Sequence, residues 1–421
     1  MTAKSGHDYR YWYLNGIPYD FKDFLKNHPG GIKAIMLGRG RDCTAMFESY
    51  HTFRPADALL EKYKVKNGKV VEGSFFTFEP DGFYMTVKER ARQYFKKNKI
   101  NHTKADYLVG AFTLLEVIAT YAFMLLTFMT GNWIYAALWG LGRAMCIIGP
   151  THAGSHYAFS RSPFINKAIY IVSMAISGST PAQWTSKHVI AHHVDTNIVP
   201  VDDDTMYPLK RVLPAHKRLA FHHLQHIYIW FLYPFTLSFW SISNAIKLFA
   251  DPPIEGVTQV IYLNKLDILE TWIVLAFHLA QRFVLFFVFF PFSEAIKLYL
   301  VSEMIASTWF SLQFAVNHEV DGVVDHTPNK KVDWGKHQVI TSHNYGSDSY
   351  LALYLSGGLN TQIEHHLFPS VHYHHYKELS KIVRQTCKEF NIKYIASSNF
   401  YEALKAHYRH LRRMGQPIEA A

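Results

Sequence analysis

The sequence predicts an all-α integral membrane helical bundle of about four transmembrane helices with a cytosolic helical cap, preceded by a small soluble α+β module. Three observations predict this fold. The first 70 residues are polar, five long apolar runs follow them, and many of the 25 histidines lie in pairs or clusters. A helix of about 20 apolar residues crosses the hydrocarbon core of a bilayer, so runs of this length indicate a membrane protein.

Composition separates a membrane partner from a nucleic-acid partner. The net charge of +10 alone suits nucleic acid or an anionic membrane surface. The aromatic residues, 16% of the chain, lie in apolar runs rather than between basic residues, which favours a membrane and no nucleic acid. The three cysteines, Cys43, Cys146 and Cys387, form no CxxC pair, so neither a disulfide framework nor a thiolate zinc site is expected. The first 16 residues lack the apolar core of a signal peptide.

The N-terminal module carries a histidine in "NHPGG" (residues 27–31) and a second one, 23 residues later, in "FESYHTF". Two histidines on separate loops clamp a haem iron from both sides and leave no open position, which favours electron transfer over oxygen binding. These motifs resemble the cytochrome b5 domain over residues 8–70. The resemblance implies a haem b with His28 and His51 as its axial ligands.

Residues 71–105 are expected to connect the module to the membrane region. The stretch "SFFTFEPDG" ends in turn-forming residues and predicts a linker. From Phe83 to Lys99, apolar residues recur at helical spacing among lysines and arginines. This pattern predicts an amphipathic basic helix on an anionic membrane surface, and a helix packed within a globular domain is the alternative.

The apolar runs and the histidines together predict the topology. The five runs are Tyr107–Thr130, Trp133–Ile148, Ile227–Phe249, Trp272–Phe292 and Ala295–Val316. If the histidine clusters share one membrane face, an even number of crossings separates them. We therefore expect Ile227–Phe249, which contains Pro234, to be interfacial or re-entrant. The lysines and arginines of residues 187–226 predict a cytosolic location for the clusters and the N-terminus.

Seven histidines lie in three clusters with metal-ligand spacing, namely His152, His156, His188, His192, His193, His365 and His366. Helical residues four apart share a face, so each HxxxH pair can converge on one metal. Adjacent residues point about 100° apart and can reach two different metals. Seven imidazoles exceed one tetrahedral zinc site and suit two transition metals, of which iron fits oxygen chemistry. Gln362, on the same helical side as His365 and His366, is expected to bind a metal or a metal-linked water.

The order HxxxH, HxxxHH, QxxHH resembles the membrane fatty-acyl desaturases, over nearly the whole chain, with residues 106–421 as the desaturase domain. "GGLNTQIEHHLFP", "QVITSHN" (residues 338–344) and the fused haem module resemble the front-end subfamily. The family also implies a further metal ligand at His318. One departure is Ala153, where many front-end desaturases carry Asp, and it bears on regiochemistry. The histidines of "FHHLQH" (222, 223, 226) and "HYHHY" (372, 374, 375) are interpreted as interfacial or lid residues.

The resemblance implies a di-iron enzyme of the endoplasmic reticulum membrane. It would use O2 and two electrons to introduce a cis double bond between an existing one and the carboxyl end of a long polyunsaturated acyl chain, as acyl-CoA or acyl-phospholipid. The chain lacks a GxGxxG fingerprint after a strand, so electrons are expected from a separate NADH-cytochrome-b5 reductase. The alternatives are a sphingolipid long-chain-base desaturase or fatty-acyl hydroxylase with the same ligands, and a non-catalytic haem-binding membrane adaptor.

Overall fold

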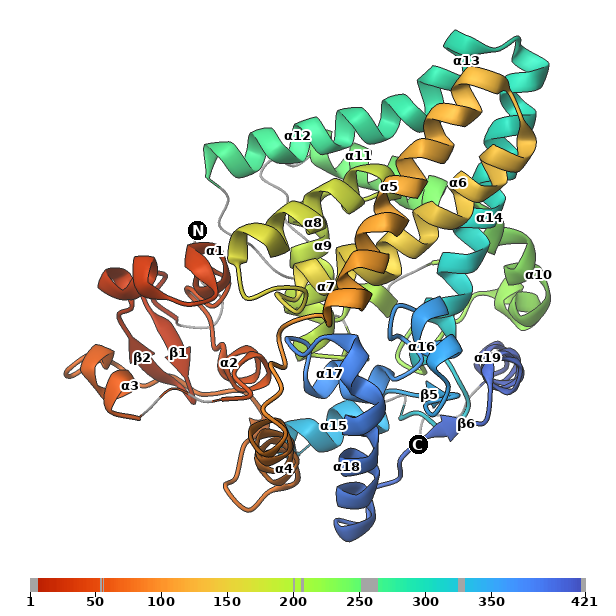
Figure 1. Cartoon of the computed structure of the whole chain (residues 1–421). Coiled ribbons are helices and arrows are strands. Elements are labelled where there is room, and N and C mark those ends of the chain that lie inside the picture. Colours follow the sequence, from red (N-terminus) through yellow and green to blue (C-terminus); the bar gives the residue numbers. More distant parts are fainter. Residues whose placement is uncertain are drawn as a thin grey trace.

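The computed structural model describes residues 7–417, except residues 54, 56, 200, 206–207, 251–263 and 325–329. The chain is mostly helical, as predicted, and its N-terminal module lies at one side of the helical body (Figure 1). Long helices extend from one end of the body and short helices of the C-terminal half form the other end. The histidine clusters lie on short helices where the two ends meet.

The N-terminal module has its own small core. Its elements are β1 (Trp12–Leu14), β2 (Ile17–Tyr19), a 3₁₀ turn (Lys22–Asn27), α1 (Gly31–Met36), α2 (Thr44–Tyr50) and α3 (Asp57–Tyr63). Strands β1 and β2 pair antiparallel through a two-residue turn, Asn15-Gly16, in which both residues have positive φ. Asn-Gly favours this turn because neither residue pays the usual steric cost. Trp12, Tyr19 and Leu60 are buried between the hairpin and the helices.

The connection after the module differs from the prediction of a free linker and a membrane-surface helix. Strand β3 (Phe76–Thr77) pairs in parallel with β4 (Val332–Asp333), so the linker is fixed to the C-terminal half. Helix α4 (Phe83–Lys97) forms as predicted, but its apolar face is buried in the protein. That face packs on α18 (Tyr376–Glu389), and the packed globular helix was therefore the correct alternative.

Two helical stretches are long and apolar enough to cross a membrane, Tyr107–Thr130 (α5) and Lys265–Phe289. The second consists of α12 (Lys265–Leu279), a π-helical turn (Ala280–Val284) and α13 (Leu285–Phe289). Large apolar side chains on the outer face of α5 are exposed, as expected of a helix in contact with lipid. These two stretches support a membrane-bound protein but do not confirm four crossings.

The remaining predicted runs form shorter or more polar helices. Helix α6 (Trp133–Cys146) packs on α5 and on α14 (Phe292–His318), which begins after Pro291. The run 227–249 is broken at Pro234. It forms α10 (Gln225–Leu232), a 3₁₀ turn (Tyr233–Phe235) and α11 (Thr236–Ala250). Proline lacks the backbone N–H and clashes with the preceding turn, which accounts for the break.

A buried ionic group fixes the long helices against one another. Glu303 of α14 forms ion pairs with Arg143 of α6, at 3.1 Å, and with Arg282, at 2.5 Å. All three side chains are almost completely buried. Charged side chains are costly in an apolar bundle unless they are paired, so this triad specifies how α6, α14 and the π-helical turn pack.

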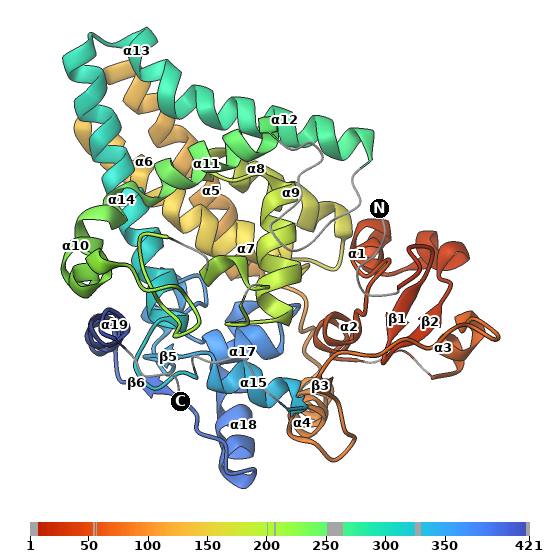
Figure 2. The ribbon, with the colours of Figure 1, turned by 180° about the vertical axis from the view of Figure 1, so that it is seen from behind.

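The C-terminal half forms a helical cap below the long helices (Figures 1 and 2). Its elements are α15 (Trp334–Ile340), α16 (Tyr350–Leu355), α17 (Gln362–Leu367), α18, α19 (Phe400–Met414), and the parallel pair β5 (Asn344–Tyr345) and β6 (Ala396–Ser397). The short helices α7 (His152–Ser155) and α9 (Pro181–Trp184) lie between cap and long helices, and α8 (Pro163–Ser177) packs on α6 and α12. This arrangement brings residues 150–193 beside residues 318–366.

Candidate metal centre and haem site

Three short helical segments carry the clustered histidines. The first cluster lies on α7 and its C-cap, directly after a π-helical turn (Ile147–Thr151). The second lies on a π-helix (Thr185–His192) whose C-cap is His193. The third lies on α17. Every clustered histidine is buried.

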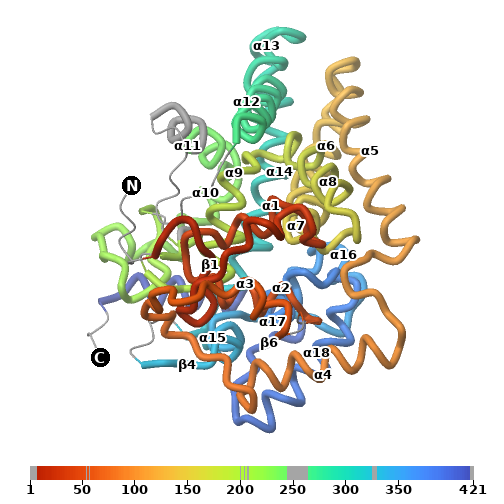
Figure 3. Tube along the Cα trace, turned by 90° about the vertical axis from the view of Figure 1, so that its left-hand side faces the viewer, coloured from red at the N-terminus to blue at the C-terminus, as the bar shows by residue number. Residues whose placement is uncertain are grey.

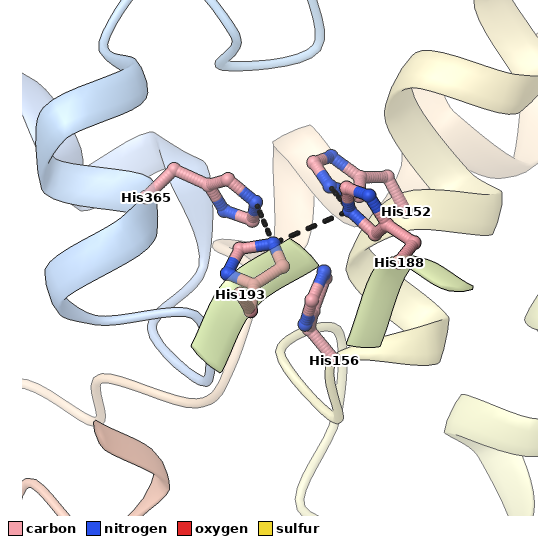
Figure 4. Close-up of side chains that lie close together, drawn as sticks. All are labelled: His152, His156, His188, His193 and His365. Atoms are coloured by element: carbon pink, nitrogen blue, oxygen red, sulfur yellow. Dashed lines mark hydrogen bonds between the residues drawn. The ribbon is translucent and has the colours of Figure 1, made fainter. Parts of the chain in front are cut away.

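Five imidazoles converge on one point (Figure 4). They belong to His152, His156, His188, His193 and His365, whose nearest ring nitrogens all lie within 4.8 Å of one another. The Nε2 atoms of His152 and His188 are 2.8 Å apart, and those of His193 and His365 are 2.9 Å apart. We call these five residues the first histidine group.

The π-helix explains how the second cluster contributes two residues to this group. A π-helix bonds residue i to residue i+5, so His188 and His193 lie above one another. Their Nε2 atoms are 3.3 Å apart. The α-helical expectation paired His188 with His192 instead. The π-helical winding keeps His188 close to His192 but places the ring of His193 beside that of His188. Short π-helical turns frequently occur at functional sites.

A second histidine group consists of His192, His318 and His366, which also lie within 4.8 Å of one another. The adjacent pairs 192/193 and 365/366 are thus each divided between the two groups, as expected from their directions on a helix. The side-chain amide of Gln362 reaches this group, with its nitrogen 2.9 Å from His318 Nε2 and 3.0 Å from His366 Nε2. Asn317 donates to the Gln362 amide oxygen on the other side.

Outer contacts orient most of these rings. The Nδ1 partners are the Tyr50 hydroxyl for His156 (2.6 Å), Asp204 for His188 (3.4 Å), Asp202 for His192 (3.1 Å), the Thr341 carbonyl for His318 (3.0 Å), the Tyr376 hydroxyl for His365 (3.2 Å) and the Gln338 amide oxygen for His366 (2.8 Å). Carboxylate, carbonyl and amide oxygens only accept, so in His188, His192, His318 and His366 Nδ1 carries the proton and the Nε2 lone pair faces the group. Metal-bound histidines are held in this way.

Electrostatics favours neutral imidazoles in the first group. Burial, followed by the neighbouring histidines, holds the pKa values of His152, His156 and His365 well below the usual range. His192 differs: burial opposes its protonation, but Asp202 and Asp204 outweigh burial and raise its pKa. A neutral imidazole is the form that binds a metal, and a carboxylate behind it increases its basicity.

The donor set fits metal ions. Lone pairs that face each other at 2.8–3.3 Å repel unless a cation lies between them. Two neighbouring ligands about 2 Å from one metal are themselves about 3 Å apart, which is the spacing seen here. The buried Nε2 of His156 faces the first group and has no hydrogen-bond partner among the described residues. Imidazole donors of this number suit transition metals such as iron.

A cavity of about 270 Å³ opens onto the second group. Its walls include His188, His192 and His318, and beyond them it is mainly apolar, with Trp240, Phe310 and other aromatic side chains. Lys187, Lys210 and Glu319 also line it. An elongated apolar ligand in this cavity would therefore lie directly against the imidazoles.

The two histidines of the N-terminal module face one another as well. The ring centroids of His28 and His51 are 6.1 Å apart. Their Nδ1 atoms contact the carbonyls of Gly31 and Phe47, which leaves Nε2 of each ring for a ligand bond. Burial lowers the pKa of His51 to about 4. An imidazole nitrogen binds a transition metal at about 2 Å, so rings at this separation leave room for one iron between them.

The other histidine-rich runs lie outside the two histidine groups. The histidines of "FHHLQH" and "HYHHY" belong to neither group; for example, His222 contacts the Pro208 carbonyl and His374 contacts Tyr354. Sequence reasoning missed the outer partners Asp202, Asp204 and Tyr50. The acidic run "DDD" at residues 202–204, ten residues after His192, was a usable signal for the two aspartates. Nothing in the sequence indicated Tyr50.

Comparison with known proteins agrees with this site. Residues 130–398 match the family described as Fatty acid desaturase. The chain belongs to this family. Residues 1–70 match the Cytochrome b5-like Heme/Steroid binding domain. The chain is thus a desaturase, an oxidoreductase of a membrane-bound family, and the predicted membership and domain fusion are confirmed.

Similar curated proteins cover nearly the whole desaturase. An Acyl-lipid (8-3)-desaturase of Mortierella alpina is 31% identical, over 96% of this chain and 93% of its own. An Acyl-lipid (8-3)-desaturase of Physcomitrium patens is 32% identical, over 95% of this chain and 87% of its own. A Probable Delta(5) fatty acid desaturase C of Dictyostelium discoideum is 29% identical, over 96% and 91%. These names favour neither a sphingolipid-base desaturase nor a hydroxylase.

Proposed function

We propose that the protein is a front-end desaturase that inserts a cis double bond between an existing one and the carboxyl end of a long polyunsaturated acyl chain. The observation that carries this proposal is the pair of buried histidine groups at the end of an apolar cavity. The names of the similar proteins, which include Delta(5) and (8-3) desaturases, support the same reaction class. Residues 8–70 form the haem domain, 71–105 the connection and 106–421 the desaturase domain.

The two histidine groups would each hold one iron. The proposed ligands are His152, His156, His188, His193 and His365 for the first group and His192, His318 and His366, with Gln362 or a water held by it, for the second. Bound iron supplies the O2-dependent oxidation of an unactivated C–H bond. The protein's part is to direct the imidazoles inward through Asp202, Asp204 and the other Nδ1 partners, while burial favours the neutral form of the first group.

The cavity would hold the acyl chain. Its aromatic walls exclude water and fix which carbon atoms face His188, His192 and His318. Lys187, which also lines the cavity, offers positive charge to the head of an acyl-CoA or an acyl-phospholipid, whereas Lys210 is paired with Glu319. The haem b held by His28 and His51 would deliver two electrons one at a time, received from a separate NADH-cytochrome-b5 reductase.

The membrane arrangement is part of the proposal. Four crossings, with α5 and α6 as one hairpin and residues 265–318 as the second, would place all three histidine clusters on one side of the membrane. The exposed apolar faces of α5 and α12 support membrane contact. The clusters and the N-terminus would face the cytosol from the endoplasmic reticulum membrane, where a cytochrome-b5 reductase can reach the haem domain.

Feeding experiments test the reaction. Yeast expressing the protein and supplied with a panel of polyunsaturated acids is expected to produce acids with one additional cis double bond on the carboxyl side of the existing ones. Mass spectrometry reads the bond positions. The His193→Ala variant, expressed at the same level, serves as the control. Hydroxylated acids, or desaturation of sphingoid bases alone, would contradict the proposal.

Gln362 tests the second iron site. The Gln362→Ala variant is expected to lose desaturation by about 10–100-fold, because groups that support metal ligands typically have effects of this size. Iron per chain, measured by elemental analysis, should fall while the haem spectrum is retained. Asn317→Ala, which removes only the donor behind the Gln362 amide, should have a smaller effect. Unchanged activity and iron in Gln362→Ala would exclude a role at the metal.

A further inference from the structure

The haem domain and the first histidine group are joined by a direct contact. Tyr50 is the last residue of α2 and immediately precedes His51. Its hydroxyl lies 2.6 Å from Nδ1 of His156, and the two rings are 6.0 Å apart at an interplanar angle of 30°. One hydrogen bond therefore connects the neighbour of a haem ligand to a member of the first group. Figure 3, which views the molecule from the left-hand side of Figure 1, shows the N-terminal module in red in front of the helical body.

His156 is unusual among the clustered histidines in the origin of its outer partner. The other Nδ1 partners identified above, such as Asp202 and Tyr376, belong to the desaturase domain. Tyr50 alone among them comes from the haem domain. Since the His156 Nε2 faces the first group, Nδ1 carries the proton and donates to the Tyr50 oxygen.

Further contacts hold the haem domain in this position. The Glu48 carboxylate forms a buried ion pair with Lys88 of α4, at 2.5 Å. The Tyr84 hydroxyl donates to the Glu48 carbonyl, and Ser370 Oγ donates to the carbonyl of Tyr50 itself. Lys33 also pairs with Asp267 at the start of α12. The Tyr50 end of the Tyr50–His156 hydrogen bond is thus anchored to the desaturase domain.

We propose that Tyr50 is the positioning residue through which electrons pass from the haem to the metal centre, by the route His51, Tyr50, His156. The inference rests on the proposed di-iron function. In each transfer a ferrous haem becomes ferric and one ferric iron of the centre becomes ferrous. One electron moves, no bond forms or breaks, and Tyr50 is left unchanged. Two such transfers, with the haem re-reduced by the separate NADH-cytochrome-b5 reductase in between, supply one turnover.

Light-driven reduction of the full-length, iron-loaded ferric enzyme tests this route without a substrate. A flash on added deazaflavin reduces the haem anaerobically, and the decay of ferrous-haem absorbance reports the arrival of the electron at the centre. Tyr50→Phe keeps the ring but removes the hydrogen bond. It is expected to slow this decay at least tenfold, with wild-type haem spectrum and wild-type iron content. Reduction of the centre by a small mediator should be unaffected.

The matched control is Tyr84→Phe, which removes another buried phenol of the same domain interface without touching a clustered histidine. It should decay at the wild-type rate. Equal slowing in Tyr84→Phe, wild-type decay in Tyr50→Phe, or loss of iron from Tyr50→Phe would each overturn the assignment of Tyr50. If the wild-type enzyme decays equally fast with and without iron, the di-iron function itself fails, which is a distinguishable result.

Discussion

Replacing His193 with alanine is expected to abolish desaturation. His193 Nε2 lies 2.9 Å from His365 Nε2 and 3.3 Å from His188 Nε2, so its ring occupies the middle of the first group. Its loss removes the donor between His188 and His365 and leaves the first group with four of its five imidazoles. Changes behind a metal ligand already cost about 10–100-fold, and removal of the ligand should cost more. Product in yeast should fall below detection, and iron per chain should fall in the purified protein.

The haem domain supplies an internal standard for this variant. His28 and His51 lie in a separate core, so the haem spectrum of His193→Ala should match that of the wild type and show that the chain is folded. His374→Ala is the matched control, because His374 is also part of a histidine-rich run but contacts Tyr354 instead of either group. It should retain iron and activity. Wild-type iron content in His193→Ala would contradict the metal assignment.

Residue types and spacing predicted which histidines lie together because helical spacing is local. The structure brings all seven clustered histidines into two groups, whatever the path of the chain between them, and the rings of His28 and His51 face each other. The division of His192 and His193 between two groups also followed from helix geometry. The pairing of His188 with His193 did not, because a π-helix cannot be distinguished from an α-helix by a short apolar pattern.

The features that could not be predicted from the sequence depend on contacts between residues that are far apart in the chain. The basic helix α4 has the apolar stripe of a membrane-surface helix, and the stripe alone does not reveal whether lipid or α18 covers it. Tyr50 contacts a residue 106 positions away, and a single sequence contains no signal for such a contact. Asp202 could be predicted only in part. It lies ten residues after His192 in the sequence, but only the fold shows that its carboxylate contacts the His192 Nδ1 atom.

Replacing His51 with alanine is expected to disturb the haem site and leave the metal centre intact, which is the reverse of the result expected for His193→Ala. The variant loses one of two facing imidazoles, so haem should be lost or become high-spin, which absorbance spectroscopy detects. Iron at the histidine groups should remain, because none of their Nδ1 partners is His51. His51→Met restores an axial ligand; methionine raises the reduction potential, so haem should be retained but should donate electrons less readily.

Activity of His51→Ala should fall by roughly tenfold or more in yeast lacking its own cytochrome b5, because a tethered donor reaches effective concentrations that a free one does not. The buried Glu48–Lys88 ion pair and the Tyr50–His156 hydrogen bond fix the haem domain beside the metal centre and strengthen this advantage. Expression of a free cytochrome b5 should restore part of the activity, in proportion to its amount. Full activity of His51→Ala in the deleted host would show that the fused domain is not the electron donor. Its haem would then stabilise the docked module without serving the reaction.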